Sequence, residues 1–365
     1  MTGFPEVSIG RAVDWRFAAT VGGWLARPAP PITEYTRRQV IDNLTDFARA
    51  AEPLVRDVTG LSADGAVPDT RIVDRAAWIT AAAESMRVMT GGTDQPNGFL
   101  TGRVTGAQTG ALLAFVSSGI LGQYDPFYAD SVDGAGSSDG CLLLVYPNVI
   151  AVERQLRLVP ADFRLWVCLH EVTHRVQFGA NRWLSGYLAQ ALAALTTESG
   201  DDVARVVARL ADYVRGRRDG AAGSGSDSSG TPPGGAPGIL GLVRAVQSEA
   251  QRTALDQMMT LGTLLEGHAD HVMDAVGPKA VPSVATIRRR FDERRQRSQP
   301  PLQRLLRALL GIDAKLSQYT RGKAFVDHVV DRVGMDRFNA VWSGPQTLPL
   351  PAEIEEPQKW IARVL

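Results

Sequence analysis

Apolar residues recur at helical spacing along most of the chain. From about residue 36 to residue 60 they fall three or four positions apart, as in a helix with one buried face. Pro53 lies inside this stretch and is expected to kink or split the helix. Similar patterns predict a short helical run within residues 1–30 and further helices at residues 70–89, 105–121, 163–178, 183–195, 201–217, 239–276 and 302–342. The chain is therefore predicted to be mainly α-helical.

The pattern changes just ahead of the helix predicted at residues 163–178. Cys141-Leu-Leu-Leu-Val-Tyr146 is a β-type run, and residues 148–153 are expected to continue in extended form after Pro147. Asp162 is the predicted N-cap of the helix that follows. We expect a small β-sheet in a mainly α (α+β) fold. Its strand could offer a free edge to an extended peptide or form a plain core hairpin, and the sequence leaves both open.

Two polar segments punctuate this pattern. Residues 122–140 are rich in Gly, Ser and Asp and are predicted to form a long loop. Residues 216–238 are low in complexity and almost free of apolar bulk, so we expect a disordered loop there. We predict an N-terminal helical region, residues 1–121, packed on the core, and a second region, residues 122–365, that carries the chemistry.

Composition narrows the class of protein. The 365 residues are 44% hydrophobic and carry a net charge of +0, which is ordinary for a globular protein and gives no field that would recruit nucleic acid. No apolar run approaches the length of a membrane span, and the first residues do not resemble a secretory signal, so we expect a cytoplasmic protein. Two cysteines, Cys141 and Cys168, exclude a disulfide-dense scaffold.

The strongest chemical signal is the motif His170-Glu171-Val172-Thr173-His174. In a helix, residues four apart share one face, so His170 and His174 can bind one zinc ion together. Glu171 is then placed to act on a water molecule bound to that zinc. Only five histidines occur in the chain, and two of them are in this motif.

A catalytic zinc site needs a third protein ligand. Glu198 with Asp202, and Glu266 with Asp270, each place two carboxylates on one helical face. Glu198 lies in a predicted turn beside a glycine, whereas Glu266 lies among apolar residues, where a buried charge needs a partner. We favour Glu266 as the ligand, with Asp270 orienting one of the ligating histidines.

Two further histidines compete with Glu266 for the metal. His268 and His271 point to other faces of the same predicted helix, so a three-histidine site stays an alternative. Together with Tyr319, they are also candidates to stabilise the oxyanion or to support the ligands.

Several segments resemble a family of uncharacterised zincin-like hydrolases, mostly actinobacterial, whose genes accompany deazaflavin coenzyme biosynthesis. The matching segments span most of the chain: Val13-Asp-Trp15, Leu121-Gly-Gln-Tyr-Asp-Pro126, Leu142-Leu-Leu-Val-Tyr-Pro-Asn148, Phe163 to His174, Leu264-Leu-Glu-Gly-His-Ala-Asp270 and Gln318 to Val326.

The resemblance implies a zincin-like metalloprotease with one zinc ion per chain. His170, His174 and Glu266 would be thermolysin-like ligands, and Glu171 the general base in hydrolysis of a peptide or amide substrate. Two alternatives remain open: a zinc-binding scaffold without catalysis, and an amidase that acts on a small molecule linked to the deazaflavin coenzyme. The sequence leaves the oligomeric state open.

Overall fold

The computed structural model describes residues 8–62, 69–93, 98–128, 140–196, 249–296 and 312–365. The longer helices in these ranges are α1 (Trp15–Leu25), α2 (Glu34–Thr59), α3 (Arg75–Met89), α4 (Phe99–Ser117), α5 (Tyr146–Leu156), α6 (Pro160–Ala180), α7 (Trp183–Thr196), α10 (Glu249–Ala280), α11 (Val284–Gln296) and α13 (Ile312–Val333). Short helices follow at α14 (Met335–Phe338), α15 (Pro351–Glu355) and α16 (Pro357–Val364). The strands are β1 (Thr70–Val73), β2 (Gly122–Asp125) and β3 (Cys141–Val145).

The mainly helical prediction is confirmed, and most strongly periodic segments are helices. Helix α2 runs through Pro53 without ending there. Helix α10 is unbroken from Glu249 until Gly277, whose positive φ of 68° interrupts it just before Pro278. The helix predicted at residues 201–217 and the loop predicted at residues 216–238 lie outside the described residues.

The sheet has the order β1–β3–β2, so the predicted strand is the central one. Strand β1 pairs with β3 in parallel, and β2 pairs with it antiparallel. The predictions of helix at residues 70–73 and of loop at residues 122–125 were wrong, because both segments gain their hydrogen bonds from β3, which is distant in sequence. Of the two alternatives left open for the strand ahead of the motif helix, the free edge does not hold, because β3 is the central strand and β1 and β2 are the edge strands.

Two local predictions at the start of α5 and α6 need correction. Residues 148–153 are helical rather than extended, because Pro147 occupies the first turn of α5, where its missing N–H is no loss. The N-cap of α6 is Val159, and Asp162 lies in the first turn. There the carboxylate of Asp162 accepts a hydrogen bond of 2.7 Å from the backbone N–H of Ser283, ahead of α11.

Strand β3 separates two hydrophobic clusters. Its alternate residues Leu142 and Leu144 join the larger cluster with α2, α5, α6, α10 and α13, whereas Cys141, Leu143 and Val145 join a smaller cluster with α1, α3 and α4. A strand buried on both faces is expected to be apolar throughout, as Cys141–Val145 is. Helix α2, which precedes residue 121, packs on α6 in the larger cluster, and the division at residue 121 stays a prediction.

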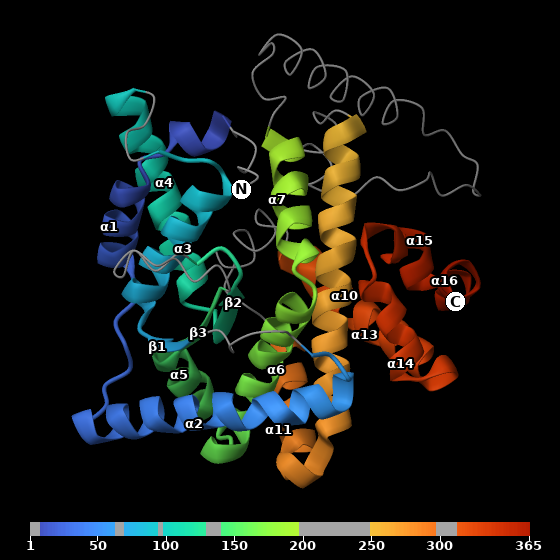
Figure 1. Ribbon diagram of the computed structural model, residues 1–365. Coiled ribbons are helices and arrows are strands. Elements are labelled where there is room, and N and C mark those ends of the chain that lie inside the picture. Colours follow the sequence, from blue (N-terminus) through green and yellow to red (C-terminus); the bar gives the residue numbers. More distant parts are fainter. Residues whose placement is uncertain (1–7, 63–68, 94–97, 129–139, 197–248, 297–311) are drawn as a thin grey trace, which may run out of the picture.

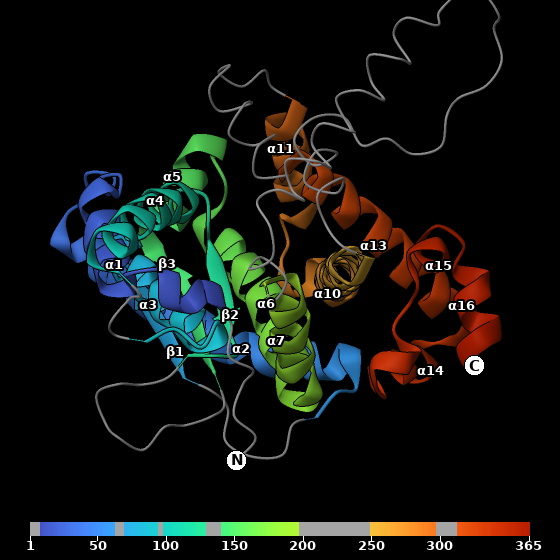
Figure 2. The same cartoon turned by 90° about the horizontal axis from the view of Figure 1, so that it is seen from above.

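Helix α6 lies in the middle of the molecule. It packs on α2 and on strand β2, and α10 packs against it together with α7 (Figure 1). Seen from above, α1, α3 and α4 cover one side of the sheet, and the C-terminal helices gather beyond α10 on the other side (Figure 2). Within the described residues, no helix is long and apolar enough to cross a membrane. Cys141 and Cys168 are buried free thiols.

Candidate metal centre

Helix α6 presents His170 and His174 side by side. The helix is anchored on both flanks: Arg175 forms an ion pair with Glu52 of α2, and Arg164 forms one with Glu153 of α5. One turn apart, the two imidazole rings meet edge to face with centroids 4.8 Å apart, and their Nε2 atoms are 3.3 Å apart. Both side chains are largely buried, with 21% and 14% of their surface exposed.

Helix α10 brings Glu266 to these two nitrogens. Its Oε2 atom lies 3.2 Å from Nε2 of His170 and 3.6 Å from Nε2 of His174. Within the described ranges, these three side chains form a group of potential metal ligands whose atoms are close enough to share one ion. Glu266 is 92 residues beyond His174 in sequence, so tertiary packing alone assembles the group.

The spacing of the three atoms suits zinc. Tetrahedral ligands about 2.0–2.1 Å from a zinc ion lie about 3.3–3.4 Å from one another, close to the three observed separations. Oε2 of Glu266 is buried, and in the described part of the chain it makes no hydrogen bond. A buried carboxylate oxygen facing two imidazole nitrogens needs a positively charged partner, and a metal ion bound between them would be one. The residues therefore fit a zinc ion.

The electrostatics of the group point the same way. Burial by itself lowers the pKa of His170, but the adjacent Glu266 carboxylate outweighs burial and raises this pKa to about 9. Burial raises the pKa of Glu266, and the two neighbouring rings outweigh it and hold this pKa well below 4.5. The pocket thus favours a positive charge beside Glu266, which a proton or a metal ion can supply.

The side chain of Glu171, on α6, lies against strand β2. Its side chain is buried, with 7% of the residue exposed, and burial raises the pKa of its carboxyl group. Gly122 of β2 packs directly on it: a Cβ atom at Gly122 would lie 2.6 Å from Cγ of Glu171. The strand therefore bounds the position that the Glu171 carboxylate can take.

Comparison with known proteins agrees with this geometry. The model of the zincin-like metallopeptidase family matches residues 13–361. The chain belongs to the zincin-like metallopeptidase family. A solved structure from Chloroflexus aurantiacus, described as a candidate hydrolase with a novel fold, is 28% identical and superposes with a TM-score of 0.64. The match covers 96% of this chain and 98% of that one. No curated protein matches the chain.

Asp270, the carboxylate predicted to orient a ligating histidine, pairs with an arginine in this zincin-like protein. Asp270 lies one turn beyond Glu266 and is close enough to His170 to help raise its pKa. Its ion-pair partner is Arg288 of α11, at 3.7 Å, and Arg288 also donates to the Asp270 carbonyl. Asp270 therefore acts on His170 through its charge, and orienting a ligand by hydrogen bonding stays a prediction.

Gln177 is a site residue that the sequence analysis missed. It lies on α6 one turn beyond His174, is fully buried, and its Oε1 atom is 2.9 Å from Nδ1 of His174. Its Nε2 atom is 2.9 Å from Nδ1 of His268. The signal was available, because residues three apart on a helix are neighbours and a buried glutamine needs partners.

Of the other residues predicted to belong to the site, those that the structure describes are not part of the group formed by His170, His174 and Glu266. The ring of His268 is fully buried between Phe338 and Trp342, and burial lowers its pKa to about 3. His271 pairs with Asp327 of α13 through Nδ1 at 2.7 Å. Tyr319 lies on α13, but its side chain is outside the described residues, as are Glu198 and Asp202.

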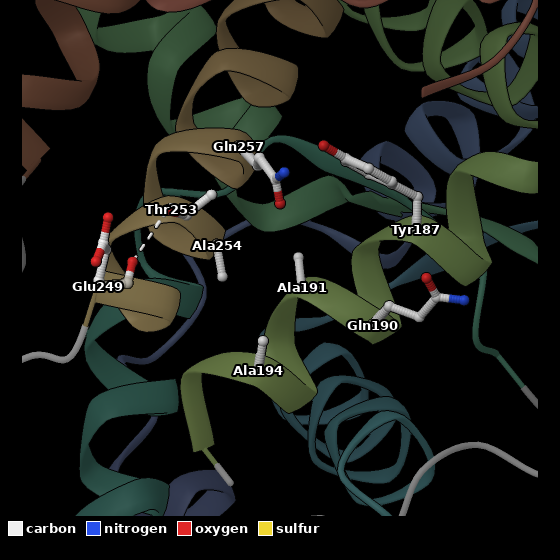
Figure 3. A pocket seen from close by; sticks show the side chains of 8 residues that line it. All are labelled: Tyr187, Gln190, Ala191, Ala194, Glu249, Thr253, Ala254 and Gln257. Atoms are coloured by element: carbon white, nitrogen blue, oxygen red, sulfur yellow. Dashed lines mark hydrogen bonds between the residues drawn. The ribbon is translucent and has the colours of Figure 1, made fainter. Parts of the chain in front are cut away.

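A cavity of about 690 Å³ lies farther along α10. It is lined by α7 and the first turns of α10, with Ala191 and Ala194 on one wall and Thr253 and Gln257 on the other (Figure 3). Gln257 is nine residues before Glu266, which corresponds to about 13 Å along the helix axis. The residues of the metal group do not line it, so this cavity is a separate feature.

Proposed function

We propose that this protein is a zinc-dependent hydrolase that cleaves peptide or amide bonds, with His170, His174 and Glu266 as ligands of one zinc ion. The buried triangle of two Nε2 atoms and one Oε2 atom carries the proposal, because its three separations suit a tetrahedral ion. Two histidines and one glutamate leave the fourth position open, which is typical of a catalytic rather than a structural zinc site.

A zinc ion held there would supply a Lewis acid that makes an attacking water molecule more acidic. Glu171 would take a proton from the attacking water and pass it to the leaving amine. Burial raises the pKa of this carboxyl group, which makes its carboxylate a stronger base. The neighbouring strand β2 packs against Cγ and Cδ of Glu171 and so limits where the carboxylate can move.

An extended peptide can be aligned by strand β2. Leu121 accepts a hydrogen bond from Val145 of β3, so in the antiparallel ladder the peptide groups of the next residue, Gly122, point away from β3. An edge strand oriented in this way can pair with a substrate backbone. Because Gly122 also touches Glu171, a peptide bound along β2 would pass beside the proposed base.

The first experiment is elemental analysis of the purified protein and its variants. We expect one zinc ion per wild-type chain, loss of zinc in Glu266→Ala, and retention in Glu198→Ala, the alternative ligand. Absence of zinc from the wild type after metal is supplied would overturn the proposal. Loss with Glu198→Ala in place of Glu266→Ala would overturn the ligand set.

The second experiment tests catalysis. Glu171→Gln should retain zinc and lose hydrolysis of a peptide library by about 10²–10⁴-fold, because proton transfer is removed while the ligands stay. The exposed Glu355→Gln serves as the matched control and should keep full activity. Turnover of small glutamyl amides without turnover of peptides would identify an amidase, and zinc binding without any turnover would favour a scaffold.

A further inference from the structure

The buried amide of Gln177 links one proposed ligand to helix α10. Its Oε1 atom faces Nδ1 of His174 at 2.9 Å, and its Nε2 atom faces the Leu265 carbonyl oxygen at 3.0 Å and Nδ1 of His268 at 2.9 Å. Gln177 is fully buried, so no solvent competes for these contacts.

The Leu265 carbonyl determines which group donates in each hydrogen bond of the Gln177 side chain. A carbonyl oxygen can only accept, so the atom of Gln177 that faces it is the NH₂ group. The other amide atom is then the oxygen, and His174 must donate to it from Nδ1. A neutral imidazole carries one proton, so Nε2 of His174 has a lone pair, and this nitrogen faces His170 and Glu266.

The same reasoning applies to His268. Because the Gln177 amide donates to Nδ1 of His268, that nitrogen accepts and the ring is neutral with its proton on Nε2. The ring is held between Phe338 and Trp342, with centroids 5.4 Å away in each case. Nδ1 of His268 therefore holds the amide of Gln177 in place. Because it makes this contact, this nitrogen does not face the reacting atoms.

We propose that Gln177, clamped by Leu265 and His268, is a positioning residue that keeps His174 protonated on Nδ1 and so leaves Nε2 ready to bind zinc. The inference rests on the proposed zinc site. It adds a second link between α6 and α10 at that site, because α10 supplies both Glu266 and the groups that clamp Gln177. Residues that orient a metal-binding histidine typically change metal affinity by about 10–100-fold when they are removed.

The test measures zinc affinity by competition with a chromophoric chelator, together with the visible spectrum of the cobalt-substituted protein. Gln177→Met keeps the volume but loses donor and acceptor, and it should weaken zinc binding by about 10–100-fold and change the cobalt spectrum. Gln177→Glu keeps an acceptor for His174, and its buried carboxyl group, when protonated, keeps one donor for Leu265 or His268, so it should recover most of the affinity. The matched control Gln190→Met, on α7, should bind zinc like the wild type.

Two results would overturn the inference while leaving the zinc site intact: wild-type affinity in Gln177→Met, or equal losses in Gln177→Met and Gln177→Glu. Failure of the wild type to bind zinc would instead overturn the proposed function. If Gln177→Met does not fold, nitrogen NMR of the histidine-labelled wild-type zinc protein decides, because only five histidines need assignment. We expect His174 to be protonated at Nδ1 and bound through Nε2, and binding through Nδ1 would contradict the inference.

Discussion

Gly122 shows how a single missing side chain can shape this site. A Cβ atom there would lie 2.6 Å from Cγ and 2.9 Å from Cδ of Glu171, and 2.8 Å from Cδ2 of Leu144. Non-bonded carbon atoms do not approach one another this closely, so any larger residue at position 122 must displace either the strand or the glutamate. Glycine at this position therefore permits β2 to pack directly against the proposed base.

We predict that Gly122→Ala lowers hydrolysis by about 10–100-fold, because a displacement of about 1 Å at a catalytic group has effects of this size. Zinc affinity should stay unchanged, since no ligand is touched. Steady-state kinetics and chelator competition measure the two effects. Gly119→Ala is the control, because its new Cβ would meet only a carbonyl oxygen at 3.7 Å. Full activity in Gly122→Ala would show that Glu171 does not depend on this contact.

Helices α10 and α13 cross with their backbones in contact beside Glu266. A Cβ atom at Gly267 would lie 2.1 Å from the carbonyl carbon of Gly322, and one at Gly322 would lie 2.0 Å from the carbonyl oxygen of Thr263. Since Gly267 is the neighbour of Glu266, this crossing sets how far α10 can move relative to the histidines on α6.

Gly267→Ala should force α10 and α13 apart. We expect the free energy of unfolding to fall by roughly 1–3 kcal/mol, as for an overpacked core, and zinc affinity to fall because Glu266 moves. Chemical denaturation and chelator competition provide the measurements. Gly262→Ala, on the same helix with nothing within 4 Å, should be neutral or stabilising by up to about 1 kcal/mol. Equal effects of the two substitutions would contradict the role of the crossing.

The C-terminal helices α15 and α16 are joined by an ion pair. Arg363 contacts the nearly buried Glu353 at 2.7 Å, and the Leu350 N–H also donates to that carboxylate. Burial by itself raises the pKa of Glu353, but these hydrogen bonds outweigh burial and lower the pKa from 4.5. A carboxyl group with a lowered pKa in the folded state stabilises the fold above pH 4.5, and this contribution is lost as the pH falls through the lowered value.

Glu353→Gln should therefore reduce the free energy of unfolding by roughly 1–2 kcal/mol at pH 7, and the difference from the wild type should shrink below pH 4.5. Urea denaturation at several pH values measures it. Glu356→Gln, whose ion pair with Lys359 is exposed, should change stability little at any pH. A difference for Glu353→Gln that is the same at every pH would contradict this assignment.

At the scale of the whole molecule, the proposed zinc site lies where α6 and α10 meet in the larger hydrophobic cluster. Buried apolar residues flank the ligands in the sequence of both helices, including Leu169, Val172, Leu265 and Ala269. The three donor atoms are grouped by this packing, so we expect the chain to fold without the metal. Bound zinc should then add its binding free energy to the stability of a chain that is already folded.

Removal of zinc with a chelator should leave the helical circular dichroism unchanged and lower the thermal unfolding midpoint. At a free zinc concentration about 100 times the Kd, the expected stabilisation is about 2.7 kcal/mol. His174→Ala should show no shift with zinc at that concentration. Unfolding of the wild type on chelation would instead mean that the metal is needed for folding.

Much of the candidate site was predictable because it depends on local geometry. The spacing of His170 and His174 places both on one face of any helix, and the apolar repeat around them predicts that helix. Glu266 was favoured over Glu198 from its apolar neighbours alone. Gln177 was missed although its partner His174 is only three residues away, because its other partners, Leu265 and His268, belong to a helix that starts 72 residues later.

The sequence by itself determined the long helices and the motif, since both follow from a repeat of about 3.6 residues that each segment carries within itself. Only the tertiary structure decided which short segments became strands and which residues met around the metal position. Strands β1 and β2 have four residues each and gain their hydrogen bonds from β3, and residues 148–153 form a helix within the core. Hydrogen bonds and packing between distant segments outweigh local preference where a segment is too short to determine its own conformation.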